Sequence, residues 1–132
     1  MKVLADTHAA IWYLWQPERL SELAVAALDE SVRTGERIGL ATISLCEVLY
    51  LAEKGRIRAD ALDLFLDAIH ASDGPFEAVP LNPAIAGLMR EFPYPSLPDM
   101  PDRIIAATAL FCRVPLITRD KRIAESALQT IW

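Results

Sequence analysis

The sequence predicts an α/β fold in which helices cover both faces of a central parallel β-sheet, so that the domain has three α/β/α layers. Short apolar segments typical of buried strands alternate along the chain with longer segments whose apolar residues recur at helical spacing. Glycine and proline residues separate these segments, as expected for turns. Because helices alternate with strands, the strands are expected to run parallel and to be joined by right-handed crossovers.

The first strand is expected at residues 2–5, and it is followed by a helix over residues 9–15. Ser21 begins an amphipathic helix that continues to about Arg33. A second short apolar strand is expected at residues 38–41.

Thr42 and Ser44 lead from this strand into a helix expected over residues 45–54. Apolar residues at helical spacing predict another helix over residues 59–71, and a third strand is expected at 76–81. The remaining elements are a helix that begins at Pro83, a proline-rich loop over 92–101, a helix that continues to about Arg113, a strand at 115–118, a short helix from Lys121 and an extended segment at 129–132.

The composition favours a single domain over residues 1–132, since 53% of the residues are hydrophobic and can form a core. A net charge of −5 argues against binding of nucleic acid through an overall positive field, but it does not exclude a nucleic-acid substrate. Asp6 interrupts the first apolar segment, so no secretory signal is expected, and no membrane helix is expected either. Cys46 and Cys112 lack ligand or disulfide spacing, so we expect buried free thiols in a soluble cytoplasmic protein.

Four carboxylates lie where strands are expected to end and helices to begin: Asp6, Glu47, Asp102 and Asp120. The carboxyl ends of parallel strands lie at one edge of a sheet, so these acids are expected to converge there. Clustered carboxylates repel one another unless a cation lies between them, and their oxygen atoms suit Mg²⁺ or Mn²⁺. Such a site activates a water molecule and hydrolyses phosphodiester bonds.

Each acid also has a purely structural interpretation as a helix cap, and these alternatives stay open at this point. Asp6 or Thr7 could cap the first helix, and Asp120 could cap the helix that begins at Lys121. Ser44 and Glu47 have the spacing of a capping box, and Asp99 and Asp102 have a similar spacing.

Other residue types give weaker indications of function. His8 and His70 have no partner at metal-ligand spacing. His8 is a candidate for contact with substrate, but a lone His just past a strand end is more often packed or at the surface. The tryptophans at positions 12, 15 and 132 are expected in the core or in an interface. Basic residues that are candidates for holding a phosphate backbone, or are simply solvated, are Lys54, Arg56, Arg58, Arg103, Arg119 and Lys121.

Four segments, in this order along nearly the whole chain, resemble the motifs of PIN-domain ribonucleases: LADTHAAIW, ISLCEVLYLAEKGRI, DMPDRIIAATAL and LITRDKRI. The resemblance is closest to VapC-like toxins of bacterial type II toxin–antitoxin pairs. It implies that the four acids bind the metal, with Asp99 as a further candidate ligand. It also implies that Thr118 is a small hydroxyl residue beside the acids. Thr7 and Arg119 are further candidates, next to two of the acids, for contact with substrate or support of the acids.

By the same resemblance, the chain is expected to be a Mg²⁺-dependent endoribonuclease in which Mn²⁺ can substitute. It is also expected to form a homodimer and to be neutralised by a cognate antitoxin. One alternative is a phosphatase with a strand-end Asp nucleophile, although His8 stands where such enzymes need a second Asp. The other is a non-catalytic interaction module whose acids only cap helices.

Overall fold

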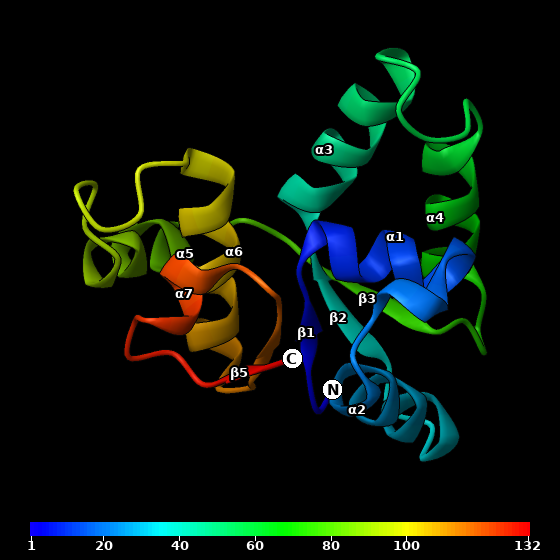
Figure 1. The fold of residues 1–132 in the computed structure, drawn as a ribbon, viewed down its shortest axis with the longest axis horizontal. Coiled ribbons are helices and arrows are strands. Elements are labelled where there is room, and N and C mark those ends of the chain that lie inside the picture. Colours follow the sequence, from blue (N-terminus) through cyan, green and yellow to red (C-terminus); the bar gives the residue numbers. More distant parts are fainter.

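The strands form one parallel sheet in the order β3-β2-β1-β4-β5, and helices lie on both of its faces (Figure 1). The computed structural model describes all residues from 1 to 132. Its strands are β1 (Leu4–Ala5), β2 (Ile38–Ala41), β3 (Phe76–Val79), β4 (Leu116–Ile117) and β5 (Thr130–Ile131). The predicted fold class is therefore confirmed, and the last extended segment is a fifth strand that pairs with β4.

The helices follow the predicted order along the chain. They are α1 (Thr7–Trp15), α2 (Glu22–Arg33), α3 (Thr42–Glu53), α4 (Ala61–His70), α5 (Pro83–Leu88), α6 (Met100–Cys112) and α7 (Lys121–Ala124), with 3-10 turns η1 (Pro17–Arg19) and η2 (Met89–Glu91). No helix in this set is long and apolar enough to cross a lipid bilayer.

Capping side chains and prolines explain several of these boundaries. The side chain of Ser21 accepts a hydrogen bond from the backbone of Ala24 at 3.0 Å, and that of Asn82 accepts one from Ile85 at 2.8 Å. β3 ends at Val79, earlier than predicted, because Pro80 has no N–H to continue the ladder. α3 begins at Thr42 and not at residue 45, so the predicted lead-in segment is helical.

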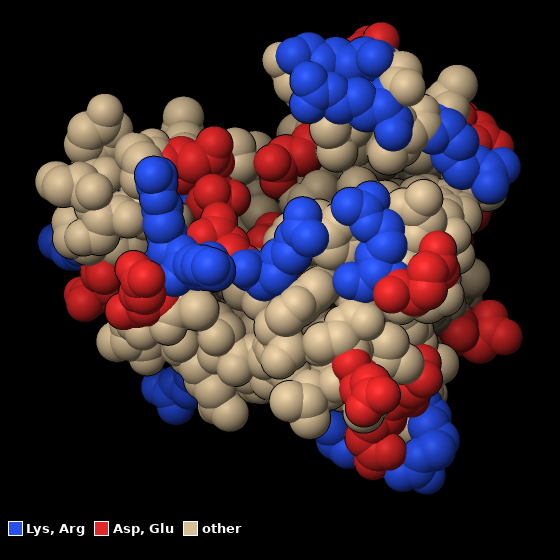
Figure 2. All heavy atoms as spheres, viewed as in Figure 1, with Lys and Arg blue, Asp and Glu red and all other residues tan.

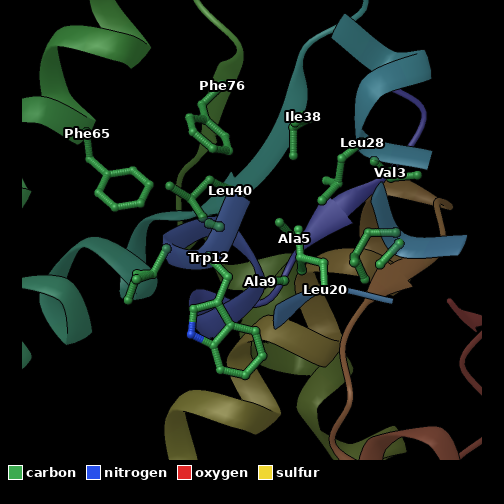
Figure 3. Packing of buried hydrophobic residues seen from close by; sticks show 14 of the residues in the cluster. Val3, Ala5, Ala9, Trp12, Leu20, Leu28, Ile38, Leu40, Phe65 and Phe76 are labelled. Atoms are coloured by element: carbon green, nitrogen blue, oxygen red, sulfur yellow. The ribbon is translucent and has the colours of Figure 1, made fainter. Parts of the chain in front are cut away.

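The alternation of side chains along the strands divides the core into two clusters. Ala5, Ile38 and Leu40 point to the face covered by α1 to α4, and Figure 3 shows this cluster with Phe65, Phe76 and Trp12 packed into it. Leu4 points to the opposite face, which α5, α6 and α7 cover.

The aromatic and cysteine side chains meet the expectations in part. Trp12 is only 6% exposed and belongs to the core, as predicted, while Trp15 and Trp132 are partly buried against it. Both cysteines are free. The prediction that Cys46 is buried is wrong, because Ser44 and Val48 occupy the inward face of α3 and Cys46 lies between them on the outward face.

Candidate functional site

The sheet order places a crevice at the carboxyl ends of β1 and β4. The connection from β1 leads to β2 on one side of it, whereas β4 lies on the other side. Ligands of open α/β sheets bind at such a switch point, because the segments that follow the two strands diverge there. Asp6 directly follows β1, and Thr118 directly follows β4.

A cavity of about 320 Å³ opens at this crevice. It is lined by Asp6, Thr7, His8, Ile11, Trp12, Glu47, Leu51, Arg56, Ile57, Asp102 and Asp120. In Figure 2, acidic side chains gather around a hollow between the region of α6 and that of α1 and α3. The structure thus brings together all four acids that the sequence singled out, although they come from four separate segments of the chain.

Asp6 is held in place through both of its carboxylate oxygens. Oδ1 accepts a hydrogen bond from the backbone N–H of Thr7 at 2.7 Å, which makes Asp6 the N-cap of α1. Oδ2 accepts a hydrogen bond from the hydroxyl of Thr118 at 2.7 Å. The cap and the site are therefore one side chain, which is 4% exposed and lines the cavity.

Glu47 is positioned by α1 and not by the start of its own helix. Thr7 Oγ1 donates to Glu47 Oε1 at 2.6 Å and lies 2.8 Å from Ser44 Oγ. The capping-box interpretation of Ser44 and Glu47 is wrong, because α3 starts at Thr42 and Ser44 is a buried residue within it. Burial raises the pKa of Glu47, and the nearby charges of Asp6 and Asp99 add to this effect, while the Thr7 hydrogen bond opposes it.

Asp99 and Asp102 have different positions although they lie on the same helix end. Asp99 is the N-cap of α6, where its side chain accepts a hydrogen bond from the backbone of Asp102 at 3.0 Å, and it does not line the cavity. Asp102 does line it. Burial raises the pKa of Asp102 to about 7, and the charges of Asp99, Asp6, Asp120 and Glu47 add to this effect.

Asp120 also combines capping with a place at the cavity. Its Oδ1 accepts a hydrogen bond from the backbone of Arg122 at 2.8 Å and a longer one from Ile123 at 3.4 Å, so it is the N-cap of α7. Its own backbone N–H donates to Thr118 Oγ1 at 3.1 Å. Thr118 thereby connects Asp120 to Asp6.

The donor set fits a hard divalent cation, because four carboxylates face one cavity and the charges of three of them, together with that of Asp99, disfavour ionisation of Asp102. No group of three or more His, Cys, Asp or Glu side chains is close enough to form one preformed metal cluster. Mg²⁺ commonly keeps several waters and takes one or two protein carboxylates together with substrate phosphate oxygens. This arrangement therefore suits Mg²⁺ or Mn²⁺ better than a metal that needs a complete protein cage.

His8 has a closer relation to the acids than the sequence indicated. Its Nδ1 lies 3.5 Å from Asp6 Oδ2, and its Nε2 accepts a hydrogen bond from the backbone of Arg119 at 3.4 Å. Its ring packs against Trp12 and Trp132, with centroid distances of 5.0 and 5.9 Å. Burial lowers the pKa of His8, which favours the neutral ring, although the charge of Asp6 opposes this shift.

The basic residues proposed from the sequence divide into two groups. Arg103 donates to the backbone carbonyls of Phe92 and Met89, and Arg58 pairs with Asp60, so both have structural partners. Lys54 lies over the ring of Tyr50. The side chains of Arg56, Arg119 and Lys121 form neither a hydrogen bond nor an ion pair within the protein. Arg56 lines the cavity, and Arg119 lies over the ring of Trp12, which lines it too.

Comparison with known proteins identifies the family. The model of the PIN domain matches residues 3–127. The chain is 31% identical over 121 residues to Ribonuclease VapC22 of Mycobacterium tuberculosis, and the match covers 92% of this chain and 88% of the relative.

Solved structures have the same fold. VapBC2 of Rickettsia felis bound to a promoter DNA fragment contains a chain with a TM-score of 0.71 and 16% identity, and the match covers 98% of this chain and 97% of that one. A toxin-antitoxin complex of Klebsiella pneumoniae contains a chain with a TM-score of 0.69 and 20% identity, covering 99% and 97%.

Proposed function

This chain belongs to the PIN domain family, and on that premise we propose that it is a metal-dependent endoribonuclease that acts as the toxin of a toxin–antitoxin pair. The observation that supports this proposal most strongly is the cavity at the carboxyl edge of the sheet, which four acids from four segments line. The likeness to a relative named a ribonuclease makes RNA the expected substrate.

Asp6, Glu47, Asp102 and Asp120 would hold Mg²⁺, or Mn²⁺ in its place, with Asp99 outside this set as the cap of α6. A bound ion of this kind would supply a water of lowered pKa and would stabilise charge on the scissile phosphate. Thr118 and the N–H of Thr7 orient the carboxylate of Asp6. The Thr7 hydroxyl orients Glu47.

Burial of the acids also prepares them to bind a cation, because it restricts the motion of their side chains. Asp6 is almost completely buried, and its two hydrogen bonds leave little freedom for its side chain to turn. A fixed carboxylate loses little conformational entropy when it binds a cation. Thr118 and Thr7 are therefore positioning residues in this proposal.

The partner is a cognate antitoxin, by likeness to the toxin–antitoxin complexes with the same fold. An Arg or Lys side chain of the antitoxin near Asp6 and Asp102 would neutralise the acids in place of the metal. A second cavity of about 380 Å³ lies beside the acidic one and offers apolar contacts to an antitoxin. It is lined by Ile11, Trp15, Gln16, Arg56, Ile57 and Arg58. A homodimer and a cytoplasmic location stay predictions.

An RNA cleavage assay tests the proposal. The purified chain is incubated with a labelled single-stranded RNA in Mg²⁺, in Mn²⁺ and in EDTA, with DNA of the same sequence as a control. We expect internal cleavage of the RNA that EDTA abolishes and added metal restores. Absence of RNA cleavage in both metals, with a folded protein that Mn²⁺ does not stabilise against heat, would favour an interaction module whose acids only cap helices.

A further inference from the structure

Two arginines share one tryptophan ring at the edge of the acidic cavity. The Cζ atoms of Arg19 and Arg119 lie 4.2 and 4.6 Å from the ring centroid of Trp12. Trp12 is buried in the core, so its ring is a fixed support for both guanidinium groups. Arg19 was not among the basic residues that the sequence indicated, since nothing in its local sequence relates it to Arg119.

The chain brings the two arginines together from distant segments. Arg19 comes from η1, and its only side-chain hydrogen bond is a long one of 3.4 Å to Gln16. Arg119 lies between Thr118 and Asp120 at the end of β4, and its backbone donates to His8. Both Trp12 and His8 line the acidic cavity, so the pair of guanidinium groups lies at its margin.

The charges of this pair are not neutralised within the protein. Both side chains are exposed, and neither forms an ion pair with a carboxylate. Cation–π contact stabilises each guanidinium on the ring, but two like charges on one indole repel each other. Phosphate oxygens bound by these guanidinium groups would lower this repulsion, and the planar guanidinium matches a phosphate in a bidentate arrangement.

The acidic cavity needs cationic side chains beside it if its substrate is a polyanion. Carboxylates repel the phosphates that flank the scissile bond, so cationic side chains beside the cavity are needed to hold the strand. In Figure 2, a band of Lys and Arg side chains runs directly below the acidic hollow.

We propose that Arg19 and Arg119, supported by Trp12, form a phosphate-binding pair that holds the backbone of single-stranded RNA on one side of the cavity. This inference rests on the proposed ribonuclease function and names the residues that position its substrate. The pair contacts the backbone and not the bases, so it contributes affinity without selecting a sequence.

The test compares Arg19→Gln, Arg119→Gln and the double variant with the wild-type chain. Arg33→Gln is the matched control, because Arg33 is an exposed arginine at the end of α2 and removing it changes the net charge equally. Binding of a fluorescent single-stranded RNA of mixed sequence is measured in EDTA at several salt concentrations. Cleavage of the same RNA is then measured in Mg²⁺ as kcat and KM.

We expect each single variant to weaken binding about tenfold and to lower the slope of log affinity against log salt by about one. KM should rise by a similar factor while kcat changes little, and Arg119→Lys should recover part of the loss because it keeps the charge. Arg33→Gln should behave as wild type. Equal losses in Arg33→Gln would show a general charge effect and overturn the proposal.

If the double variant binds RNA with unchanged affinity and salt dependence, the phosphate-binding pair is also contradicted. This holds even if the double variant loses binding to an antitoxin. The two proposals fail separately. If wild type binds RNA but does not cleave it, the proposed function fails, whereas cleavage by wild type with an unaffected double variant contradicts only the phosphate-binding pair.

Discussion

The hydroxyl of Thr118 donates a hydrogen bond to Oδ2 of Asp6 at 2.7 Å, although the two residues are 112 positions apart in the chain. The hydroxyl oxygen of Thr118 in turn accepts a hydrogen bond from the backbone N–H of Asp120 at 3.1 Å. One buried hydroxyl thus connects the segments that follow β1 and β4. It orders two of the acids that the proposed reaction needs.

Replacing Thr118 with Val should test this connection, because Val has the same shape and lacks the hydroxyl. The carboxylate of Asp6 would lose a donor and the N–H of Asp120 an acceptor, so we expect a loss of about 1–3 kcal/mol in the free energy of unfolding. RNA cleavage per folded molecule should fall about tenfold or more. Urea denaturation and initial cleavage rates give the two values.

Thr108→Val is the control for this variant. Thr108 is also a buried threonine, but its hydroxyl donates to the carbonyl of Ile104 within α6. It should alter stability slightly and leave cleavage unchanged. If Thr118→Val cleaves RNA as fast as Thr108→Val, the hydroxyl does not position the acids.

Asp102→Asn should change stability in a way that depends on pH. Burial and neighbouring acids raise the pKa of Asp102 from 3.8 to about 7. Between pH 3.8 and about 7, Asp102 loses its proton in the unfolded chain but keeps it in the folded protein, so the free energy of unfolding falls as pH rises. This loss of stability is complete above about pH 7. Asn cannot ionise, so the variant should escape this cost.

We therefore expect Asp102→Asn in EDTA to melt at a higher temperature than wild type at about pH 8, with a much smaller difference at about pH 4. Adding Mg²⁺ at the higher pH should stabilise wild type more than the variant. An equal difference in Tm at both pH values would show that the charge of Asp102 is not the cause.

Glu47→Gln separates the charge of Glu47 from its hydrogen bond. Gln can still accept a hydrogen bond from Thr7 through its side-chain oxygen, so the fold and Tm should change little. If the charge helps to hold the metal, cleavage should fall about a hundredfold, and more Mn²⁺ should be needed for half-maximal rate. Near-normal Mn²⁺-dependent cleavage would assign Glu47 a structural role only.

Alanine substitutions at two glycines should change the stability of the protein in opposite directions. A Cβ at Gly74 would overlap the carbonyl oxygen of Ala68 near the end of α4, so Gly74→Ala should be destabilising by about 2 kcal/mol or more. Gly87 lies within α5 and has open space around the position of a Cβ. Gly87→Ala should therefore stabilise the protein by about 0.5–1 kcal/mol. Thermal unfolding of both variants checks the sign of each change.

The parts of the structure that local sequence patterns determine could be predicted well. The apolar strands and the helices between them require a parallel sheet, and a parallel sheet brings residues such as Asp6 and Asp120 to one edge. Caps such as Ser21 and Asn82 depend only on neighbours a few positions away, and the helices that follow them begin within one residue of the predicted positions.

The features that could not be predicted depend on contacts between distant segments. Ser44 looks like a helix cap in its local sequence, but its position within α3 places it 2.8 Å from the hydroxyl of Thr7. Trp12 was expected in the core, yet nothing in the sequence relates its ring to both Arg19 and Arg119. His8 has no ligand spacing, and its approach to Asp6 depends on how α1 leaves β1.

The central claim is that the four acids form one metal-dependent site, and Asp6→Asn tests it most directly. Asn keeps the shape of the side chain and an oxygen that can accept from Thr7 or Thr118, so the fold should remain intact. The measurement is the initial rate of Mg²⁺-dependent RNA cleavage by the variant beside wild type, with circular dichroism to verify folding. We expect most of the cleavage to be lost in a folded protein. Cleavage at the wild-type rate by Asp6→Asn would contradict the assignment of the site.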